Sequence, residues 1–186
     1  DFSRVTLVGV LLADLTLFSG DYRAGERTFD LLTQAAGRAG RGDVPGKVVI
    51  QTYKPDNYAI TAAASQDYRA FYDIEEAYRS LMRYPPEWNM MVIMGTGMDE
   101  EQLANIMDRM YSLIRGKYIN AGHLSVIGPS EPAISKIKDV YRRVLYIKHR
   151  DYRMLVDVKD YVEEWLKENG ENDVSVFFDL NPVNMY

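Results

Sequence analysis

The sequence predicts an α/β protein whose first part carries a piece of a parallel sheet. Residues 5–12 are apolar at successive positions, which is typical of a parallel strand covered by helices on both faces. Apolar residues at spacings of three and four predict a helix over 24–36, and a second apolar strand follows over 46–53. A strand, a helix and a second strand in this order form the repeating unit of an α/β sheet.

Two further helices follow this unit and lead to a domain boundary. One is predicted over 55–64 and a longer one over 67–83. The buried stripe of the longer helix is predicted to consist of Phe71, Ile74, Tyr78 and Leu81. Residues 84–86 include two prolines and stop that helix, because proline cannot continue it. We therefore predict a first domain over 1–86 and a second over 87–186.

The second half follows the order β-α-β-(short α)-β-α-β. Strands are predicted over 88–94, 123–127, 140–148 and 174–180. Helices are predicted from Asp99 to Gly116, around Ile134 and Ile137, and over 155–168. Glycine-rich residues 95–97 are expected to form a turn. The inward stripe of the helix after Asp99 is predicted to be Leu103, Ile106, Met107, Met110 and Ile114. This order predicts a small ferredoxin-like α+β domain.

The composition excludes several classes of protein. The chain has 47% hydrophobic and 26% charged residues, which is typical of a globular protein. It has no cysteine, so neither a disulfide framework nor a thiolate-bound metal is expected. No apolar run approaches the roughly 20 residues of a membrane span, and we find no signal peptide. We expect no membrane partner.

The charge is unevenly distributed along the chain. The net charge is −5, which excludes a wholly basic nucleic-acid binder. Residues 117–159, however, carry nine basic and four acidic side chains between two acidic stretches. Because salt screens charges over about 8–10 Å, a nearby phosphate chain responds to this local excess. An ordinary solvated surface explains the same excess equally well.

Two glycine motifs look like nucleotide-binding loops but lack required residues. Residues 42–47 have three residues between the glycines instead of four, and Val48 replaces the hydroxyl residue that binds magnesium. Residues 95–100 end in glutamate where a dinucleotide fingerprint needs its third glycine. We reject both motifs. His123 and His149 have no metal-ligand spacing, so no metal site is predicted.

The segment that begins at Gln34 carries the strongest candidate for chemistry. Arg38 and Arg41 lie three residues apart at a helix end, among glycines that let a backbone approach closely. Arginine clamps phosphate with two donors and stays charged. An arginine that reaches a γ-phosphate across a cleft stabilises phosphoryl transfer. From residue types alone, a helix end with two exposed arginines is the alternative interpretation.

The spacing Gln34-x-x-Gly37-Arg38-x-Gly40-Arg41 resembles motif VI of superfamily 2 helicases. A wider set of segments resembles the PriA family of replication-restart DNA helicases, namely 1–8, 13–14, 21–32, 46–52, 84–86, 128–133 and 179–182. Asn57 departs from that family, which often has histidine there. The resemblance covers most of the chain and is stronger over its first half.

The resemblance implies the C-terminal part of an ATP-dependent 3′-to-5′ DNA helicase that restarts stalled forks and initiates primosome assembly. Residues 1–86 would be the end of a second RecA-like lobe, and residues 87–186 a domain that binds DNA or partner proteins. ATP and magnesium would be held with a first lobe, and zinc only in an upstream segment. The implied partners are forked and single-stranded DNA, the single-stranded DNA-binding protein and other primosome proteins, in the cytoplasm.

The resemblance also assigns roles to residues. Arg38 and Arg41 would reach the γ-phosphate, Gln34 would couple the nucleotide to DNA movement, and Gly37 and Gly40 would permit the tight turn. The chain alone is expected to hydrolyse nothing, because the first lobe lies outside it.

The basic segment supplies the candidates for binding DNA or the acidic tail of the single-stranded DNA-binding protein. These candidates are Arg142, Arg143, Lys148 and Arg150. Because successive residues of a strand point to opposite faces, Tyr141, Arg143 and Lys148 are not all expected to line one groove.

Other interpretations stay open. The chain is alternatively a nucleic-acid or protein-binding module without catalysis, or part of an RNA helicase or another superfamily 2 translocase. Its first residues lead at once into a strand, so we expect a piece of a longer protein, with Tyr186 as a natural end.

Overall fold

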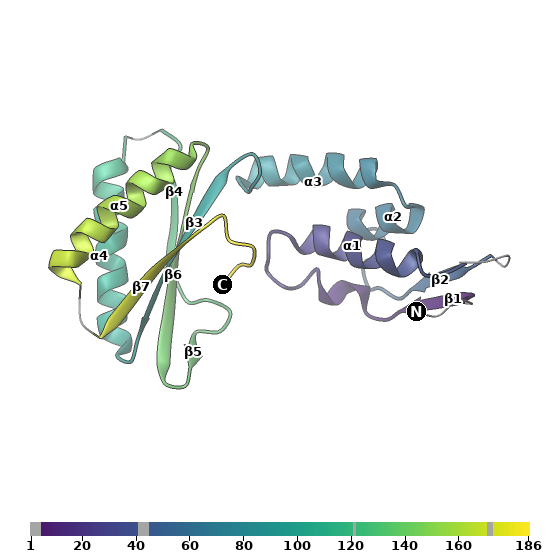
Figure 1. Cartoon of the computed structure of the whole chain (residues 1–186), viewed down its shortest axis with the longest axis horizontal. Coiled ribbons are helices and arrows are strands. Elements are labelled where there is room, and N and C mark those ends of the chain that lie inside the picture. The colour runs from purple at the N-terminus through teal and green to yellow at the C-terminus, as the bar shows by residue number, and fades with distance from the viewer. Residues whose placement is uncertain (1–4, 41–44, 121, 171–172) are drawn as a thin grey trace. The chain divides into compact units, whose positions relative to one another are not determined.

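The computed structural model describes residues 5–40, 45–120, 122–170 and 173–186. The chain divides into two compact units, Asp1–Arg79 with Met185, and Ser80–Asn184 with Tyr186. The mixed α/β character expected from the sequence is confirmed, since both units combine helices with a sheet (Figure 1).

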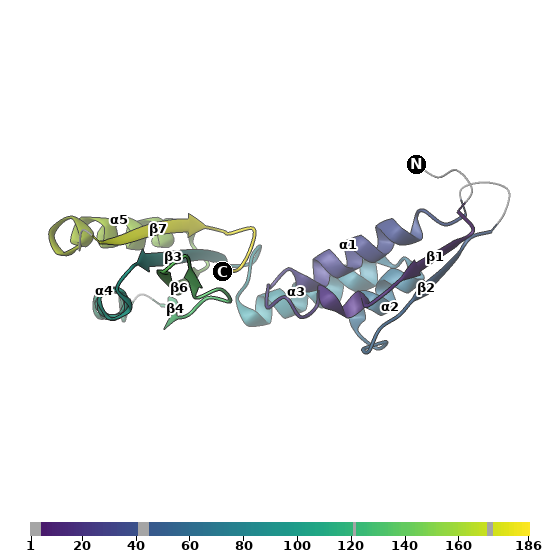
Figure 2. The same ribbon diagram turned by 90° about the horizontal axis from the view of Figure 1, so that it is seen from below.

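The first unit is built on two parallel strands joined by a helix. Its elements are β1 (Leu7–Val10), the 3₁₀ helix η1 (Ala13–Leu15), α1 (Ala24–Ala36), β2 (Lys47–Ile50), α2 (Tyr58–Ser65) and α3 (Tyr68–Met82). Figure 2 shows β1 and β2 side by side, with Leu7 paired to Lys47 and Val10 to Ile50. The helix predicted over 24–36 is confirmed at both ends.

Strand β1 is not buried on both faces, contrary to the prediction. Val10 and Ile50 pack on a core that includes Phe29 and Leu32. On the opposite face, Leu7 is 61% exposed. Within the described residues, helices pack on one face of this two-stranded sheet.

Helix α3 buries a different face from the predicted one. Phe71 is buried and stacks on Phe29 with ring centroids 4.4 Å apart. Ile74, Tyr78 and Leu81, however, are exposed. The predicted stripe was wrong because the face that packs inward continues from Phe71 through two charged residues, Glu75 and Arg79. These satisfy each other by an ion pair.

The second unit is an α+β domain. Its elements are β3 (Asn89–Gly97), α4 (Glu100–Tyr118), β4 (Ser125–Ser130), β5 (Lys136–Ile137), β6 (Val140–His149), α5 (Tyr152–Asn169) and β7 (Val174–Leu180). The strand order is β4-β6-β3-β7, with each neighbouring pair antiparallel and β5 paired to β6. Helices α4 and α5 cover the same face of this sheet (Figure 1).

The core of the second unit lies between that face and the two helices. The predicted inward stripe of α4 is confirmed, because all five of its residues are fully buried. They meet Met91 and Ile93 of β3, Leu145 and Ile147 of β6, and three residues of α5. This packing fixes which residues of β6 point to the helices and which point to the opposite face.

Two local predictions in this unit were wrong. The short helix expected around Ile134 and Ile137 is absent, and Ile137 instead belongs to strand β5. Lys138 and Asp139 adopt positive φ values of 47° and 65° and turn the chain directly into β6, as in a two-residue hairpin turn.

The expected turn over 95–97 is also absent, because strand β3 continues through Gly97. A side chain at Gly95 would collide with Leu103 and Met107 of α4. Gly95 therefore lets the helix pack closely on the strand, and it does not mark a turn.

Candidate functional site

The predicted arginine motif lies on the turn that ends helix α1. The Gly37 amide donates to the Thr33 carbonyl at 2.9 Å, and the Arg38 amide to the Ala35 carbonyl at 3.1 Å. The side chains of Gln34 and Arg38 are exposed, on consecutive turns of the chain. Arg41 lies outside the described residues.

The turn is held by two glycines that approach each other at its base. Gly40 has a φ of +75°, a conformation that side-chain-bearing residues rarely adopt. A Cβ on Gly40 would lie 2.7 Å from the Gly46 amide nitrogen, and a Cβ on Gly46 would collide with the Gly40 amide. The sequence prediction that Gly40 permits a tight turn rested on the family resemblance. The close approach to Gly46 was not foreseen.

The motif lies at the amino ends of the two parallel strands. The Gly40 amide donates to the Val5 carbonyl at 2.9 Å, and the Lys47 amide to the Thr6 carbonyl at 2.8 Å. Open α/β sheets usually bind their own ligand outside the carboxyl ends of the strands. Gln34 and Arg38 are therefore displayed at the end of the sheet opposite to that usual site.

At the amino end of α1, away from the motif, an ion-pair network joins this helix to α3. Arg79 of α3 donates to Glu75 at 2.7 Å and to Glu26 of α1 at 2.7 Å. Arg23 also pairs with Glu26 at 3.2 Å, and the Tyr58 hydroxyl donates to Glu75 at 2.5 Å. Spacing in the sequence does not indicate this pair, because Arg79 lies 53 residues further along the chain than Glu26.

The network sets the charge state of its members. The hydrogen bond from Arg23, joined by that from Arg79, lowers the pKa of Glu26. Burial opposes ionisation of Arg79, but hydrogen bonds to Glu26 and Glu75 outweigh it and raise the pKa of its guanidinium. Burial and the bond to Glu75 raise the pKa of the Tyr58 hydroxyl. All three shifts stabilise the paired form that holds α1 in place.

A buried carboxylate fixes the opposite end of the sheet. Asp14 accepts hydrogen bonds from the Thr52 hydroxyl at 2.7 Å and from the Tyr53 amide at 2.8 Å. The bond from the Tyr53 amide does most to lower the pKa of Asp14. Its interactions are satisfied within the fold, so we assign Asp14 a structural role.

The four basic candidates of the second unit are not on one surface. Arg142 and Lys148 share the face of β6 that also carries Val144, whereas Arg143 points to the helix side. Arg150 follows the strand and is exposed. The separation of Arg143 from Arg142 and Lys148 agrees with the expected alternation along a strand.

Each candidate has a distinct environment. Arg142 donates to the Ile134 carbonyl at 3.1 Å and contacts Met94 Sδ at 3.3 Å. Arg143 lies 3.9 Å from Glu100. The Arg150 guanidinium lies over the Trp88 ring, 5.4 Å from its centroid. These contacts leave Arg150 as the candidate most accessible to a phosphate.

Lys148 is buried, with 5% of its surface exposed. Its Nζ donates to the Met82 carbonyl at 3.2 Å and lies over the Tyr84 ring, 3.5 Å from the centroid. Burial, with a smaller effect from Arg83, lowers the pKa of Lys148 to about 8. The position of Lys148 on β6 was predicted. Its burial was not, because the residues that cover it, Met82 and Tyr84, come before β3 in the sequence.

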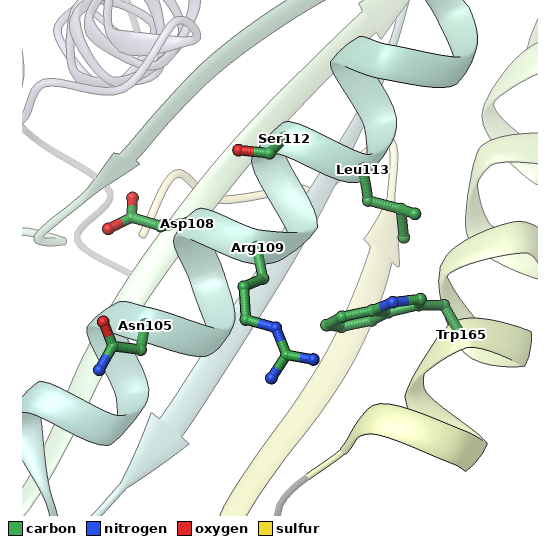
Figure 3. Close-up of a pocket in the computed structure, with 6 residues that line it drawn as sticks. All are labelled: Asn105, Asp108, Arg109, Ser112, Leu113 and Trp165. Carbon is green, nitrogen blue, oxygen red and sulfur yellow. The ribbon is translucent and has the colours of Figure 1, made fainter.

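A groove runs between the outer surfaces of α4 and α5. It has a volume of about 810 Å³ and is lined by Asn105, Asp108, Arg109, Ser112, Leu113 and Trp165. Figure 3 shows Arg109 directed toward Trp165, with its guanidinium 4.9 Å from the ring centroid. Arg109 also donates to Asn169 at 3.1 Å. The groove contains none of the sequence-predicted site residues.

The described residues contain no group of three or more His, Asp and Glu side chains placed to hold a metal ion. His149 is used structurally, since its Nδ1 accepts from the Asp151 amide at 3.0 Å and its Nε2 lies 3.1 Å from the Gly122 carbonyl. Within the same described ranges, no helix is both long enough and apolar enough to cross a membrane.

Comparison with known proteins relates the chain to one family along its whole length. The Replication restart protein PriA of Bacillus subtilis (strain 168) is 37% identical over 187 residues, which is 100% of this chain and 23% of the relative. Proteins of the same name from Synechocystis sp. and Chlamydia trachomatis are 31% and 33% identical over 185 residues, again covering 100% of this chain. The chain spans about a quarter of the length of these curated relatives.

Likeness to solved structures is weaker. The de novo designed protein Foldit4 matches with a TM-score of 0.36 and 18% identity, over 50% of this chain and 97% of the design. That score is too low to carry an argument about the fold. The model of the primosomal protein N C-terminal domain, in contrast, matches residues 80–183, which are more than half of the chain. The chain therefore belongs to the family of the primosomal protein N C-terminal domain.

Proposed function

We propose that the chain is the C-terminal part of an ATP-dependent 3′-to-5′ DNA helicase that restarts stalled replication forks and initiates primosome assembly. The observation that carries the proposal is the similarity of the whole chain to proteins named Replication restart protein PriA, at 31–37% identity. Because the chain spans about a quarter of those proteins, it supplies two elements of such an enzyme and not the complete catalyst.

The first element is a set of residues for the nucleotide. In this proposal Arg38 and Arg41 reach the γ-phosphate, and Gln34 couples the nucleotide to DNA movement. ATP and magnesium are bound with a part of the protein outside this chain, where any zinc is also bound. The exposed position of Gln34 and Arg38, at the amino ends of the strands, supports this role. This exposure suits side chains that act on a ligand bound by another part of the protein.

We assign the first unit to the end of a RecA-like lobe. The parallel pairing of β1 and β2 through α1 supports this assignment. So does the uncovered apolar face that carries Leu7, since parallel strands are usually buried on both faces. The rest of the lobe would cover that face.

The second element is a binding domain for DNA and for partner proteins, with a ferredoxin-like fold. The β-α-β-β-α-β order and the strand order β4-β6-β3-β7 support that fold. Arg142, Arg143, Lys148 and Arg150 are the candidates for phosphates or for the acidic tail of the single-stranded DNA-binding protein. The exposure of Arg150 supports it most, whereas the burial of Lys148 suggests a supporting role.

The proposal is tested in the full-length protein with Arg41→Ala. We expect DNA-dependent ATP hydrolysis and fork unwinding to be lost while the affinity for forked DNA is nearly unchanged. Arg69→Ala is the matched control, because Arg69 is 81% exposed on α3 and pairs only with Asp73 among the described ion pairs. Normal ATP turnover in the Arg41 variant would overturn the assignment of the motif.

A further inference from the structure

The face of the second unit's sheet opposite the helices carries an aromatic cluster. Tyr146 of β6 and Tyr186 pack on a small core of Val92, Met94 and Val144. Phe177 of β7 lies on the same face and is 42% exposed. We call the space bounded by Tyr146, Phe177 and Asp179 the Tyr186 slot, because the side chain of Tyr186 occupies it.

Tyr186 is held in this slot by one ring contact and two hydrogen bonds. Its ring meets Phe177 edge to face, with centroids 6.2 Å apart and planes at 71°. Its hydroxyl donates to Asp179 Oδ2 at 2.7 Å, and the Tyr146 hydroxyl donates to its carbonyl at 3.0 Å. The bond to Asp179 raises the pKa of Tyr186, which agrees with a hydroxyl that donates to a carboxylate.

The slot therefore accepts a planar ring with a hydrogen-bond donor at its far edge. A nucleobase with an exocyclic amino group has the same two properties, since its ring stacks on aromatic side chains and its amino group donates to a carboxylate. Asp179 is the acceptor, and Phe177 and Tyr146 are the aromatic walls. Sheets of this kind bind single strands by stacking bases on exposed aromatic residues.

A cation lies beside the slot. Arg142 acts on Tyr186 electrostatically, and its guanidinium contacts a carbonyl and a thioether. A strand whose base entered the slot would carry its phosphate past the positively charged side chain of Arg142.

We propose that the Tyr186 slot binds one base of single-stranded DNA, and that Tyr186 occupies it until the strand displaces its ring. This inference rests on the proposed function, because it places a DNA contact on the second unit. Tyr186 then acts as an internal competitor. The apparent association constant for DNA then equals that of the open slot multiplied by the fraction of molecules whose slot is open.

The first experiment removes the competitor. Anisotropy titrations of the 186-residue chain use fluorescein-labelled oligo(dC) and oligo(dT) in low salt. We expect Tyr186→Ala to tighten oligo(dC) binding by about threefold or more, because the slot no longer needs to be vacated. Val183→Ala is the matched control, since Val183 belongs to the same segment and is 64% exposed. It should leave the affinity unchanged.

The second experiment removes a wall of the slot. Phe177→Ala, made in the Tyr186→Ala background, should weaken oligo(dC) binding by about 5- to 150-fold, which is the range for losing one stacked base. Ile127→Ala is the control, because Ile127 is 47% exposed on the same face but cannot stack. Asp179→Asn should reduce the preference for oligo(dC) over oligo(dT).

The outcomes separate this inference from the proposed function. If DNA binds the parent chain but neither Tyr186→Ala nor Phe177→Ala changes its affinity, the slot is not a DNA site, while the function stands. If no variant binds DNA, including the one with an open slot, both the inference and a DNA-binding second unit are overturned. Thermal unfolding of each variant shows whether a lost affinity reflects lost folding.

Discussion

The backbone of Gly40 lies against the backbone of Gly46, where the turn after α1 meets the start of β2. A Cβ on either residue would collide with the other, and Gly40 also has a φ of +75°. The turn that displays Arg38 therefore depends on two residues without side chains. Its geometry requires this close approach of main-chain atoms.

Replacing either glycine should destabilise the first unit. We expect Gly46→Ala to lower the free energy of unfolding by about 1–3 kcal/mol. The new methyl group would collide with main-chain atoms, which cannot move away. Urea denaturation checks this value. Gly9→Ala is the matched control, because a Cβ at Gly9 meets nothing within 4 Å. A Gly46 variant as stable as the Gly9 variant would contradict the packing described above.

The ion pair of Arg79 with Glu75 should contribute far more to stability than the ion pair of Arg69 with Asp73 on the same helix. Arg79→Met leaves Glu75, whose side chain is 7% exposed, without its cation, and should lower the free energy of unfolding by about 3 kcal/mol. Arg69 has the same i,i+4 spacing to Asp73 but is 81% exposed, so Arg69→Met should change the stability by less than about 0.5 kcal/mol. Paired urea titrations compare the two, and equal effects would show that the network does not support α1.

The pH dependence of stability should reveal the buried lysine. The pKa of Lys148 falls from an ordinary 10.5 to about 8 in the folded chain. Between these values the unfolded chain binds a proton that the folded chain has released, so stability should rise as pH increases from about 8 toward 10.5.

Lys148→Met should remove that rise and stabilise the chain at pH 7 by about 1–3 kcal/mol, because no buried charge remains. Lys159→Met is the control, since Lys159 pairs with Glu163 at 2.8 Å and gains nothing from losing its charge. Urea titrations at pH 7 and pH 9.5 give both values. A Lys148 variant with the same pH profile as the parent would show that this lysine is not desolvated.

The salt dependence of DNA binding should distinguish the exposed arginine from the buried lysine. If Arg150 contacts a phosphate of single-stranded DNA, Arg150→Ala should reduce the slope of log affinity against log salt by about 0.7. Lys148→Met should leave the slope unchanged, because the lysine ammonium is bound to the Met82 carbonyl. Anisotropy titrations between low and moderate salt measure the slope. A larger change for Lys148 than for Arg150 would reverse the two roles.

Sequence periodicity predicted the helices and strands best where apolar residues alone form the core. The stripe of α4 from Leu103 to Ile114 is fully buried, as its spacing predicts. The prediction for α3 was wrong because the helix buries Glu75, a charge whose partners come from α2 and from α3 itself. A pattern based on hydrophobicity cannot identify a charged residue that is satisfied by side chains distant in sequence.

Local turn chemistry explains the other errors. The hairpin at Lys138 and Asp139 uses positive φ values without glycine or asparagine, the residues that mark such turns most clearly. The sequence predicted a turn at Gly95. In the structure, its missing side chain instead lets Met107 of α4 pack closely on β3. For the candidate sites, strand alternation separated Arg143 from Lys148 correctly. Lys148 is buried by Met82 and Tyr84, and no periodic pattern in the sequence indicates that these residues contact β6.

The proposed function requires that the turn after α1 supplies arginines to an ATP site, which the rest of the protein completes. The most direct test is the kcat of DNA-dependent ATP hydrolysis by full-length protein carrying Arg38→Ala, with forked-DNA affinity measured in parallel. We predict that kcat falls by about 10³-fold or more, as for other arginines that stabilise phosphoryl transfer, while fork affinity is retained. A kcat within a few-fold of the parent protein would contradict the claim.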